Sequence, residues 1–430
     1  MKNNSDPVIP RKTIIPFILV TSLFALWGFA NSITDPMVQA FKKVLELSNS
    51  EAAWVQMSFY GGYFCMAIPA SIFIKKYSYK SGILVGLGLY ALGALLFYPA
   101  AVTEKFWFFC LGLYILTFGL AFLETTANPY ILSMGSSKTA IRRLNLAQFF
   151  NPFGLLAGLL VAQQFILKNL KSDNISNFSN LDDLGKQLIR TSDLIVIRDP
   201  YVILGISVLL FLILIIFTKM PVNKDDSSNL RIKQIAHRLL KNSKYKWGVL
   251  AQTFYVGAQI MCWTYIYQYA EGIGINSSMA ANYQLTAFIL FFLGRGIGTF
   301  MLRYVSSVKL LMTYSLISSI LCIGTILING YLGLYCLVLI SFFMSIMFPT
   351  IYGLSLEGLS ENESKIGAAG LVMAIVGGAL LPKFQGSIID LGGVKVNDII
   401  ILGASEVNLS FILTLICYLY LVYYCKKILL

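Results

Sequence analysis

Three ionisable residues, Asp35, Glu124 and Arg295, lie within long apolar segments of the 430-residue chain. A charge at mid-membrane depth costs about 2.5–3.5 kcal/mol on insertion scales, so such a residue persists where it faces protein or a water-filled cavity. The carboxyls offer proton exchange, and the guanidinium offers binding of a substrate or of a carboxylate in a charge-assisted pair. A fixed structural pair is the alternative for Arg295.

Glu124 lies near the middle of the apolar segment 106–134, and Asn128 follows one helical turn later on the same face. A buried carboxyl that takes up and releases a proton is a proton carrier. The alternative is a structural carboxyl that pairs with a neighbouring helix. We predict the proton carrier, because an acid within the membrane is costly to keep.

Asp35 ends the first apolar segment, and Trp27 and Asn31 precede it by eight and four residues on one helical stripe. An aromatic ring beside an amide and a carboxylate suits a sugar, since the ring covers an apolar sugar face while the polar groups bind hydroxyls. Asp35 also precedes Pro36, so an ordinary helix-end residue in the headgroup zone is the alternative. Position alone leaves both interpretations open.

Two further apolar segments carry uncharged polar residues at helical spacing. They are Asn145, Gln148 and Asn151 in one segment, and Gln252, Tyr255, Gln259 and Trp263 in another. Amides at this spacing often bind helices together. Polar stripes on four different segments favour instead one hydrated central cavity. The alternating glycines at 294, 296 and 298 predict close helix approach around Arg295.

The composition excludes a water-soluble protein. Hydrophobic residues make up 57% of the chain and charged residues 12%, about half the charged share of a soluble domain. The mean hydropathy is +0.73. The net charge of +13 comes from short basic clusters between apolar runs. This distribution is better explained by orientation in a bilayer than by binding to nucleic acid. We therefore predict an all-α integral membrane protein.

The sequence lacks the parts of an enzyme. It has no phosphate-binding loop, no nucleophile elbow and no dinucleotide-binding unit. His237 is the single histidine, which argues against a metal site, and the seven cysteines form no CxxC pair and are expected to be free thiols. We predict a transporter without a cofactor or a metal, coupled to the proton.

Twelve segments are apolar and long enough to span a bilayer. They are 13–36, 52–74, 82–100, 106–134, 142–167, 200–218, 247–270, 280–302, 308–328, 332–356, 366–389 and 407–425. If both termini are cytoplasmic, the inner segments hold 22 Lys and Arg residues, and the outer segments hold ten when Lys383, near the outer end of the span 366–389, is counted with them. The positive-inside rule therefore predicts both termini in the cytoplasm.

The spans divide six and six. We predict an N-terminal bundle of residues 1–218, a basic cytoplasmic linker of residues 219–246, and a C-terminal bundle of residues 247–430. In the linker, the stretch 230–240 is either an amphipathic helix on the inner membrane surface or a solvated connection. A polar outer loop is expected at 168–199. The halves are weak copies offset by about 220 residues, an arrangement typical of transporters.

Several motifs resemble the fucose permease branch of the major facilitator superfamily. The run from Phe24 to Asn31 that Asp35 closes resembles its first helix, and residues 123–129 (Leu-Glu-Thr-Thr-Ala-Asn-Pro) resemble its fourth. Further matches are residues 75–80, 143–148, 255–259, 292–295, 343–351 and 372–378. The likeness runs in order from about residue 14 to residue 391. Ser32 and Phe348 depart from the branch, which tends to carry asparagine and tyrosine there.

This resemblance implies two pseudo-symmetric six-helix bundles that rock about a midplane cavity, and it implies an L-fucose:proton symporter. Asp35 and Glu124 would be the functional carboxylates, while Gln148 and Asn151 would line the sugar site. We add Trp27, Asn31, Asn128, Gln259, Trp263 and Arg295 as further expected substrate contacts. We expect a functional monomer whose partners are a monosaccharide, protons and the lipid bilayer.

Three alternatives stay open. Relatives in the same branch resemble glucose/galactose transporters, so another hexose is the first alternative. An antiporter that exports sugars or drugs would use the same carboxylates in the opposite direction. A sensor that binds a sugar without transporting it is the more remote alternative.

Overall fold

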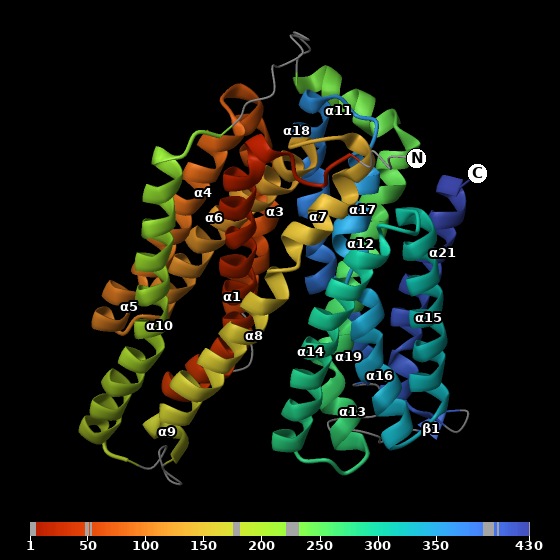
Figure 1. Cartoon of the computed structure of the whole chain (residues 1–430). Helices are drawn as coiled ribbons and strands as arrows, with labels where there is room; N and C mark the ends of the chain where they lie inside the picture. Colours follow the sequence, from red (N-terminus) through yellow and green to blue (C-terminus); the bar gives the residue numbers. More distant parts are fainter. Residues whose placement is uncertain are drawn as a thin grey trace. The chain divides into compact units, whose positions relative to one another are not determined.

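The computed structural model describes residues 6–47, 51, 54–174, 181–220, 232–389, 400–401 and 404–429. Over these ranges the chain is almost entirely helical (Figure 1). Eleven helical segments within them are long and apolar enough to cross a membrane. The predicted all-α, multi-pass membrane architecture is confirmed.

The elements follow the predicted spans in chain order. The first half forms α1 (Ile14–Val44), α3 (Trp54–Lys76), α4 (Tyr79–Leu95), α5 (Phe97–Thr103), α6 (Phe106–Ser133), α7 (Ala140–Gln148), α8 (Asn151–Val161), α9 (Lys171–Asn174) and α10 (Asp183–Phe217). The second half forms α11 (Ile232–Lys241), α12 (Ser243–Thr264), α13 (Ile266–Gly272), α14 (Ser277–Met301), α15 (Ser307–Leu327), α16 (Tyr331–Met344), α17 (Met347–Leu356), α18 (Glu361–Met373), α19 (Gly377–Ile389), α20 (Glu406–Ser410) and α21 (Ile412–Leu429). Two short antiparallel strands, β1 (Ile400–Ile401) and β2 (Ala404–Ser405), precede α20.

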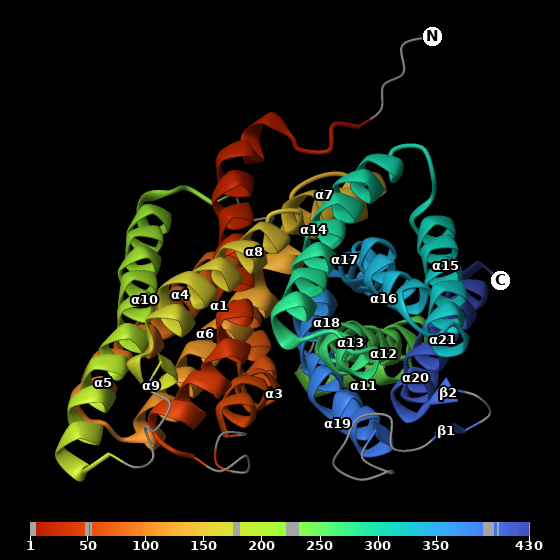
Figure 2. The same cartoon turned by 90° about the horizontal axis from the view of Figure 1, so that it is seen from below.

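The seventh predicted span, 247–270, is formed by α12 and α13. It is absent from the eleven strongly apolar segments because residues such as Gln252 and Gln259 lower its hydropathy. α12 packs against α16, α17, α18, α19 and α21, among other elements, and can be followed among them in Figure 2. A helix that is enclosed by protein needs fewer apolar residues than one that faces lipid.

The described chain packs as two compact units. One comprises Arg11–Tyr130 and Phe153–Asp226, and the other comprises Met1–Pro10, Ile131–Pro152 and Ser227–Leu430. We refer to them as the α1 unit and the α12 unit. α7 therefore packs with helices from the second half of the sequence, and α8 packs with helices from the first. The predicted division into bundles at 218 and 247 stays a prediction.

Three spans are broken near a proline, one of them between α4, which ends at Leu95, and α5, which begins two residues before Pro99. α7 ends at Gln148 and α8 begins at Asn151, one residue before Pro152. α16 ends at Met344 and α17 begins at Met347, two residues before Pro349. Proline has no N–H and crowds the preceding turn, so it commonly breaks or kinks a helix.

α1 continues beyond the predicted end of the first span. The helix runs through Pro36 to Val44, so residue 35 lies inside a helix, and the interpretation of Asp35 as a helix-end residue is wrong. A single proline removes one backbone hydrogen bond, which a helix of 31 residues tolerates. The side chain of Asp35 lies outside the part of the structure that is described.

The predicted outer loop 168–199 is helical over much of its described length, because α9 lies within it and α10 begins at Asp183. The side chain of Asp182 accepts a hydrogen bond from the N–H of Gly185 and caps α10. Polar residues extend the helix beyond its apolar part, since helix formation does not require apolar side chains. Residues 175–180 of this predicted loop lie outside the described residues.

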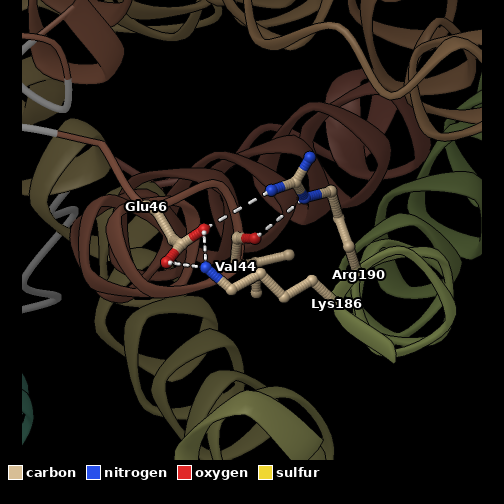
Figure 3. Close-up of polar contacts among 4 residues, drawn as sticks. All are labelled: Val44, Glu46, Lys186 and Arg190. Atoms are coloured by element: carbon tan, nitrogen blue, oxygen red, sulfur yellow. Dashed lines mark hydrogen bonds and ion pairs between the residues drawn. The ribbon is translucent and has the colours of Figure 1, made fainter. Parts of the chain in front are cut away.

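An ion-pair cluster joins this extension of α10 to the end of α1 (Figure 3). Glu46 pairs with Lys186 at 3.2 Å and with Arg190 at 3.7 Å. The Nε of Arg190 also donates to the carbonyl of Val44 at 3.4 Å. The side chains of the three charged residues are 20–35% exposed, so the cluster lies at the protein surface.

The amphipathic helix predicted over 230–240 is present as α11, and residues 230 and 231 lie outside the described ranges. Its apolar residues Ile235 and Leu239 are buried, and the helix contacts α18. Arg238 on α11 lies 3.9 Å from Glu363 on α18. This apolar face therefore packs on protein, in contrast to the prediction of a helix lying on lipid.

The seven cysteines are free thiols, as the sequence predicted. Four of them are buried, namely Cys262, Cys322, Cys417 and Cys425. These buried cysteines pack between helices as small apolar side chains do.

Candidate functional site

The indole of Trp27 is held in a defined orientation on α1. Its Nε1 donates to the hydroxyl of Tyr63 on α3 at 2.9 Å, and its ring stacks on Phe24 at 5.2 Å between centroids. The residue is 2% exposed. Asn31 lies one turn further along α1 and is partly exposed. Trp27 and Asn31 lie one turn apart on the same helix, and a sugar contact by either of them stays a prediction.

Glu124 is buried on α6 without a cation. It is 7% exposed, and its Oε2 has no hydrogen-bond partner among the residues that the structure describes. No Lys or Arg of the described chain forms an ion pair with it. Tyr63 lies within electrostatic range of the carboxyl. An acid in such surroundings is costly when charged, which suits a group that binds and releases a proton.

Asn128 follows Glu124 on α6 and is fully buried. Its Nδ2 donates to the backbone carbonyl of Glu124 at 3.1 Å, so the side chain turns back along its own helix. This bond is a local side-chain to backbone contact. A direct contact between Asn128 and a substrate stays a prediction.

The stripe Asn145, Gln148 and Asn151 spans the break between α7 and α8. Asn145 is buried and donates to the hydroxyl of Thr350 on α17 at 3.2 Å, which is the helix-binding role considered for such amides. Gln148 is 4% exposed and Asn151 is partly exposed. The three residues therefore do not lie on one continuous helix face.

Arg295 on α14 is 2% exposed and is bound to backbone carbonyls. Its Nε donates to the carbonyl of Ser345 at 2.6 Å, and its Nη1 donates to the carbonyl of Gln148 at 2.9 Å. The guanidinium also lies 4.6 Å from the ring of Phe291. No carboxylate of the described chain pairs with it, and the ion-pair alternative stays a prediction.

α12 presents the second polar stripe. Trp263 donates from Nε1 to the hydroxyl of Ser341 at 3.3 Å, and Tyr255 donates to the carbonyl of Met344 at 3.0 Å. Gln252 is fully buried, and both of its amide atoms lack a partner within the described residues. Gln259 is partly exposed. A buried amide without protein partners is costly unless water or a ligand binds it.

The predicted site residues divide between the two units. Trp27, Asn31, residue 35, Glu124 and Asn128 belong to the α1 unit, and Gln148, Asn151, Gln259, Trp263 and Arg295 belong to the α12 unit. That the two sets line one cavity stays a prediction.

Sequence reasoning missed Tyr63, although it lies in an apolar segment that also contains Tyr60. A tyrosine in a membrane segment gives no periodic signal that distinguishes a partner of Trp27 from a packing residue. Among the described residues no group of three or more His, Cys, Asp or Glu side chains is arranged to hold a metal ion.

Comparisons with known proteins identify the family. The family model of the Major Facilitator Superfamily matches residues 18–382. The L-fucose-proton symporter of Haemophilus influenzae is 53% identical over 423 residues, which cover 97% of each chain. The L-fucose-proton symporter of Escherichia coli is 39% identical over 389 residues, which cover 89% of each chain.

A solved structure agrees with this assignment. The crystal structure of the transporter FucP in the outward conformation matches with a TM-score of 0.87 and 35% identity, and the match covers 97% of this chain and 99% of that one. The family model and these relatives extend over the helices that carry the predicted site. The chain therefore belongs to the major facilitator superfamily and, within it, to the fucose permease branch.

Proposed function

We propose that this protein takes up L-fucose together with a proton by alternating access. The observation that carries the proposal is its 53% identity, over 97% of the chain, to a protein named as an L-fucose-proton symporter. The buried Glu124, which has no cation partner in the described chain, supports it from the side of chemistry. Neither metal nor cofactor is part of the proposal, because the proton is the coupling ion.

Glu124 is the proton carrier in this proposal, and Asp35 is the second carboxylate. Protonation of a buried carboxyl removes a charge from a region where charge is costly, so the loaded carrier can change conformation. Loss of the proton on the other side restores the charge. After it has released the sugar and the proton inside, the empty carrier returns to its outward-facing state.

Trp27 supports sugar binding on the α1 side. The hydrogen bond to Tyr63 and the stack on Phe24 hold its indole in place, so the ring needs little reorganisation to cover an apolar sugar face. Asn31 and Asn128 supply amides from the same unit. Gln148, Asn151, Gln259 and Trp263 supply the polar groups of the α12 unit.

The excess of Lys and Arg in alternate connections supports both termini on the cytoplasmic side of a bacterial inner membrane. The proton gradient across that membrane then drives the sugar inward. The unit of transport in this proposal is one chain, because each chain carries both halves of the predicted site.

Uptake of radiolabelled L-fucose into liposomes that contain the purified protein tests the proposal. A proton gradient directed inward, with the acidic side outside, should produce accumulation of the sugar above the no-gradient control. A protonophore should abolish this accumulation. Competition by unlabelled L-fucose, D-galactose, D-glucose and L-arabinose then ranks the substrates. Stronger competition by galactose or glucose would indicate a glucose/galactose transporter instead.

The remaining alternatives give different results in the same liposomes. Addition of sugar outside should make the medium more alkaline if the protein is a symporter, whereas proton release would indicate an antiporter. Fucose binding without accumulation under any gradient would indicate a sensor.

A further inference from the structure

The two backbone carbonyls that Arg295 binds share one property. In an α-helix, the carbonyl of residue i accepts a hydrogen bond from the N–H of residue i+4. The residue four positions after Gln148 is Pro152, and the residue four positions after Ser345 is Pro349. Because proline has no N–H, both carbonyls lack their usual helical donor.

The guanidinium of Arg295 supplies both missing donors. Its Nε lies 2.6 Å from the oxygen of Ser345 and its Nη1 lies 2.9 Å from the oxygen of Gln148. A planar guanidinium holds its N–H groups in a rigid fork, so one side chain can bridge two fixed acceptors. In a membrane protein an unpaired carbonyl at this depth is costly, since no bulk water satisfies it.

The two helix ends also explain how a buried cation exists without a carboxylate in the described chain. The C-terminal end of a helix carries a partial charge of roughly −0.5. α7 ends at Gln148 and α16 ends at Met344, one residue before Ser345, so two such ends meet at Arg295. Their combined partial charge is similar in size to the charge of one guanidinium and opposite in sign.

The surroundings of Arg295 are shaped for this contact. A Cβ at Gly294 would collide with the carbonyl oxygen of Phe342 near the end of α16, so glycine is needed for α14 to approach that helix. Phe149 in the break packs on Phe292 of α14, with 4.7 Å between ring centroids. A Cβ at Gly296 would lie 3.0 Å from Phe149. The predicted close approach at these glycines is confirmed.

We propose that Arg295 is a positioning residue that replaces the hydrogen bonds removed by Pro152 and Pro349, and that it thereby holds both helix breaks open. Gln148 and Asn151, the last residue of α7 and the first of α8, flank one of these breaks. Arg295 acts on the sugar through them, and not as a direct ligand. The part of this inference that concerns the sugar rests on the proposed function, and the part that concerns the helix breaks does not.

Arg295→Gln, compared with wild type in lipid nanodiscs, tests the inference. Backbone hydrogen exchange is measured in peptides that cover 146–153 and 343–350, without sugar. Loss of the two bonds should raise exchange in both segments by about tenfold, the factor that corresponds to 1.4 kcal/mol. Arg303→Gln removes an exposed arginine just after α14 and is the matched control, for which exchange should stay unchanged.

A suppressor separates positioning from the other roles. Pro152→Ala and Pro349→Ala, combined with Arg295→Gln, return the two missing N–H donors and allow both helices to close. Exchange in both segments should then fall back toward the wild-type rate. L-fucose affinity should be about tenfold weaker than in wild type, because the helix breaks that position Gln148 and Asn151 are lost. Recovery of both exchange and affinity would reduce Arg295 to a structural role and overturn the positioning role.

Three further outcomes separate this inference from its alternatives. Unchanged exchange in Arg295→Gln together with a large loss of L-fucose affinity would overturn it in favour of a direct sugar ligand. If Arg295→Gln does not fold, Arg295→Lys takes its place, since lysine keeps the charge but cannot bridge both carbonyls. Arg295→Lys should raise exchange in at least one segment. Wild-type exchange in both segments would overturn the inference. If wild-type protein binds no L-fucose, the proposed function fails, and the exchange experiment still tests whether Arg295 stabilises the two helix breaks.

Discussion

Trp27 donates a hydrogen bond from its indole Nε1 to the hydroxyl of Tyr63, across 2.9 Å between α1 and α3. Both side chains are 2% exposed. The bond fixes the ring that the sequence pattern places beside Asn31. Tyr63 in turn lies within electrostatic range of Glu124, the predicted proton carrier.

Tyr63→Phe should therefore weaken L-fucose binding. The substitution leaves the buried N–H of Trp27 without an acceptor, at a cost of about 1–3 kcal/mol. Release of the ring should lower the apparent affinity about tenfold, equivalent to 1.4 kcal/mol. Titration of tryptophan fluorescence with L-fucose measures the change. Tyr77→Phe, at a tyrosine that is 58% exposed, is the control, and wild-type affinity in Tyr63→Phe would contradict the role of the bond.

Glu124→Gln should uncouple transport from the proton gradient. The amide resembles the protonated carboxyl, so the carrier should still exchange sugar for sugar in counterflow but lose accumulation driven by a pH gradient. Both assays use labelled L-fucose in liposomes. Glu271→Gln, at an exposed glutamate, should keep both activities. Gradient-driven accumulation at the wild-type level in Glu124→Gln would exclude Glu124 as the coupling group.

The surface cluster at Glu46 should contribute little to stability. Its side chains are partly exposed, and such ion pairs are worth up to about 1 kcal/mol. Glu46→Gln should lower the free energy of unfolding by less than that amount, and 1 M salt should remove the difference. A double-mutant cycle with Lys186→Gln, measured by denaturation in mixed micelles, gives the coupling energy. A coupling that persists in 1 M salt would show that the pair is not screened.

Gly294→Ala should destabilise the protein where Gly88→Ala does not. A Cβ at Gly294 would collide with the carbonyl oxygen of Phe342 and lie 2.8 Å from the hydroxyl of Ser345, whereas a Cβ at Gly88 would meet Leu212 at an ordinary 3.8 Å. Overpacking of this kind costs about 1–3 kcal/mol. In contrast, Gly88→Ala should be neutral or stabilising by up to about 1 kcal/mol. Melting temperatures of the two purified variants decide the matter, and equal values would argue against the close contact of α14 with α16.

The break between α7 and α8 shows which features of this segment the residue pattern predicts and which it does not. Spacing alone placed Asn145, Gln148 and Asn151 on one stripe. The helix ends after Gln148, so the stripe divides into a helix-binding residue and two residues that flank a break. Pro152 was visible in the sequence, but a proline signals a break without saying which distant group satisfies the freed carbonyl.

What the sequence determined by itself is the membrane architecture, its family and the costly groups within it. Apolar length, the distribution of Lys and Arg, and isolated acids such as Glu124 follow from the chemistry of a bilayer, which acts on each segment separately. Only the tertiary structure decided that Arg295 binds two backbone carbonyls and that Trp27 is held by Tyr63. Those partners lie 36 to 147 residues away along the chain, and backbone acceptors carry no residue type, so no local pattern could reveal them.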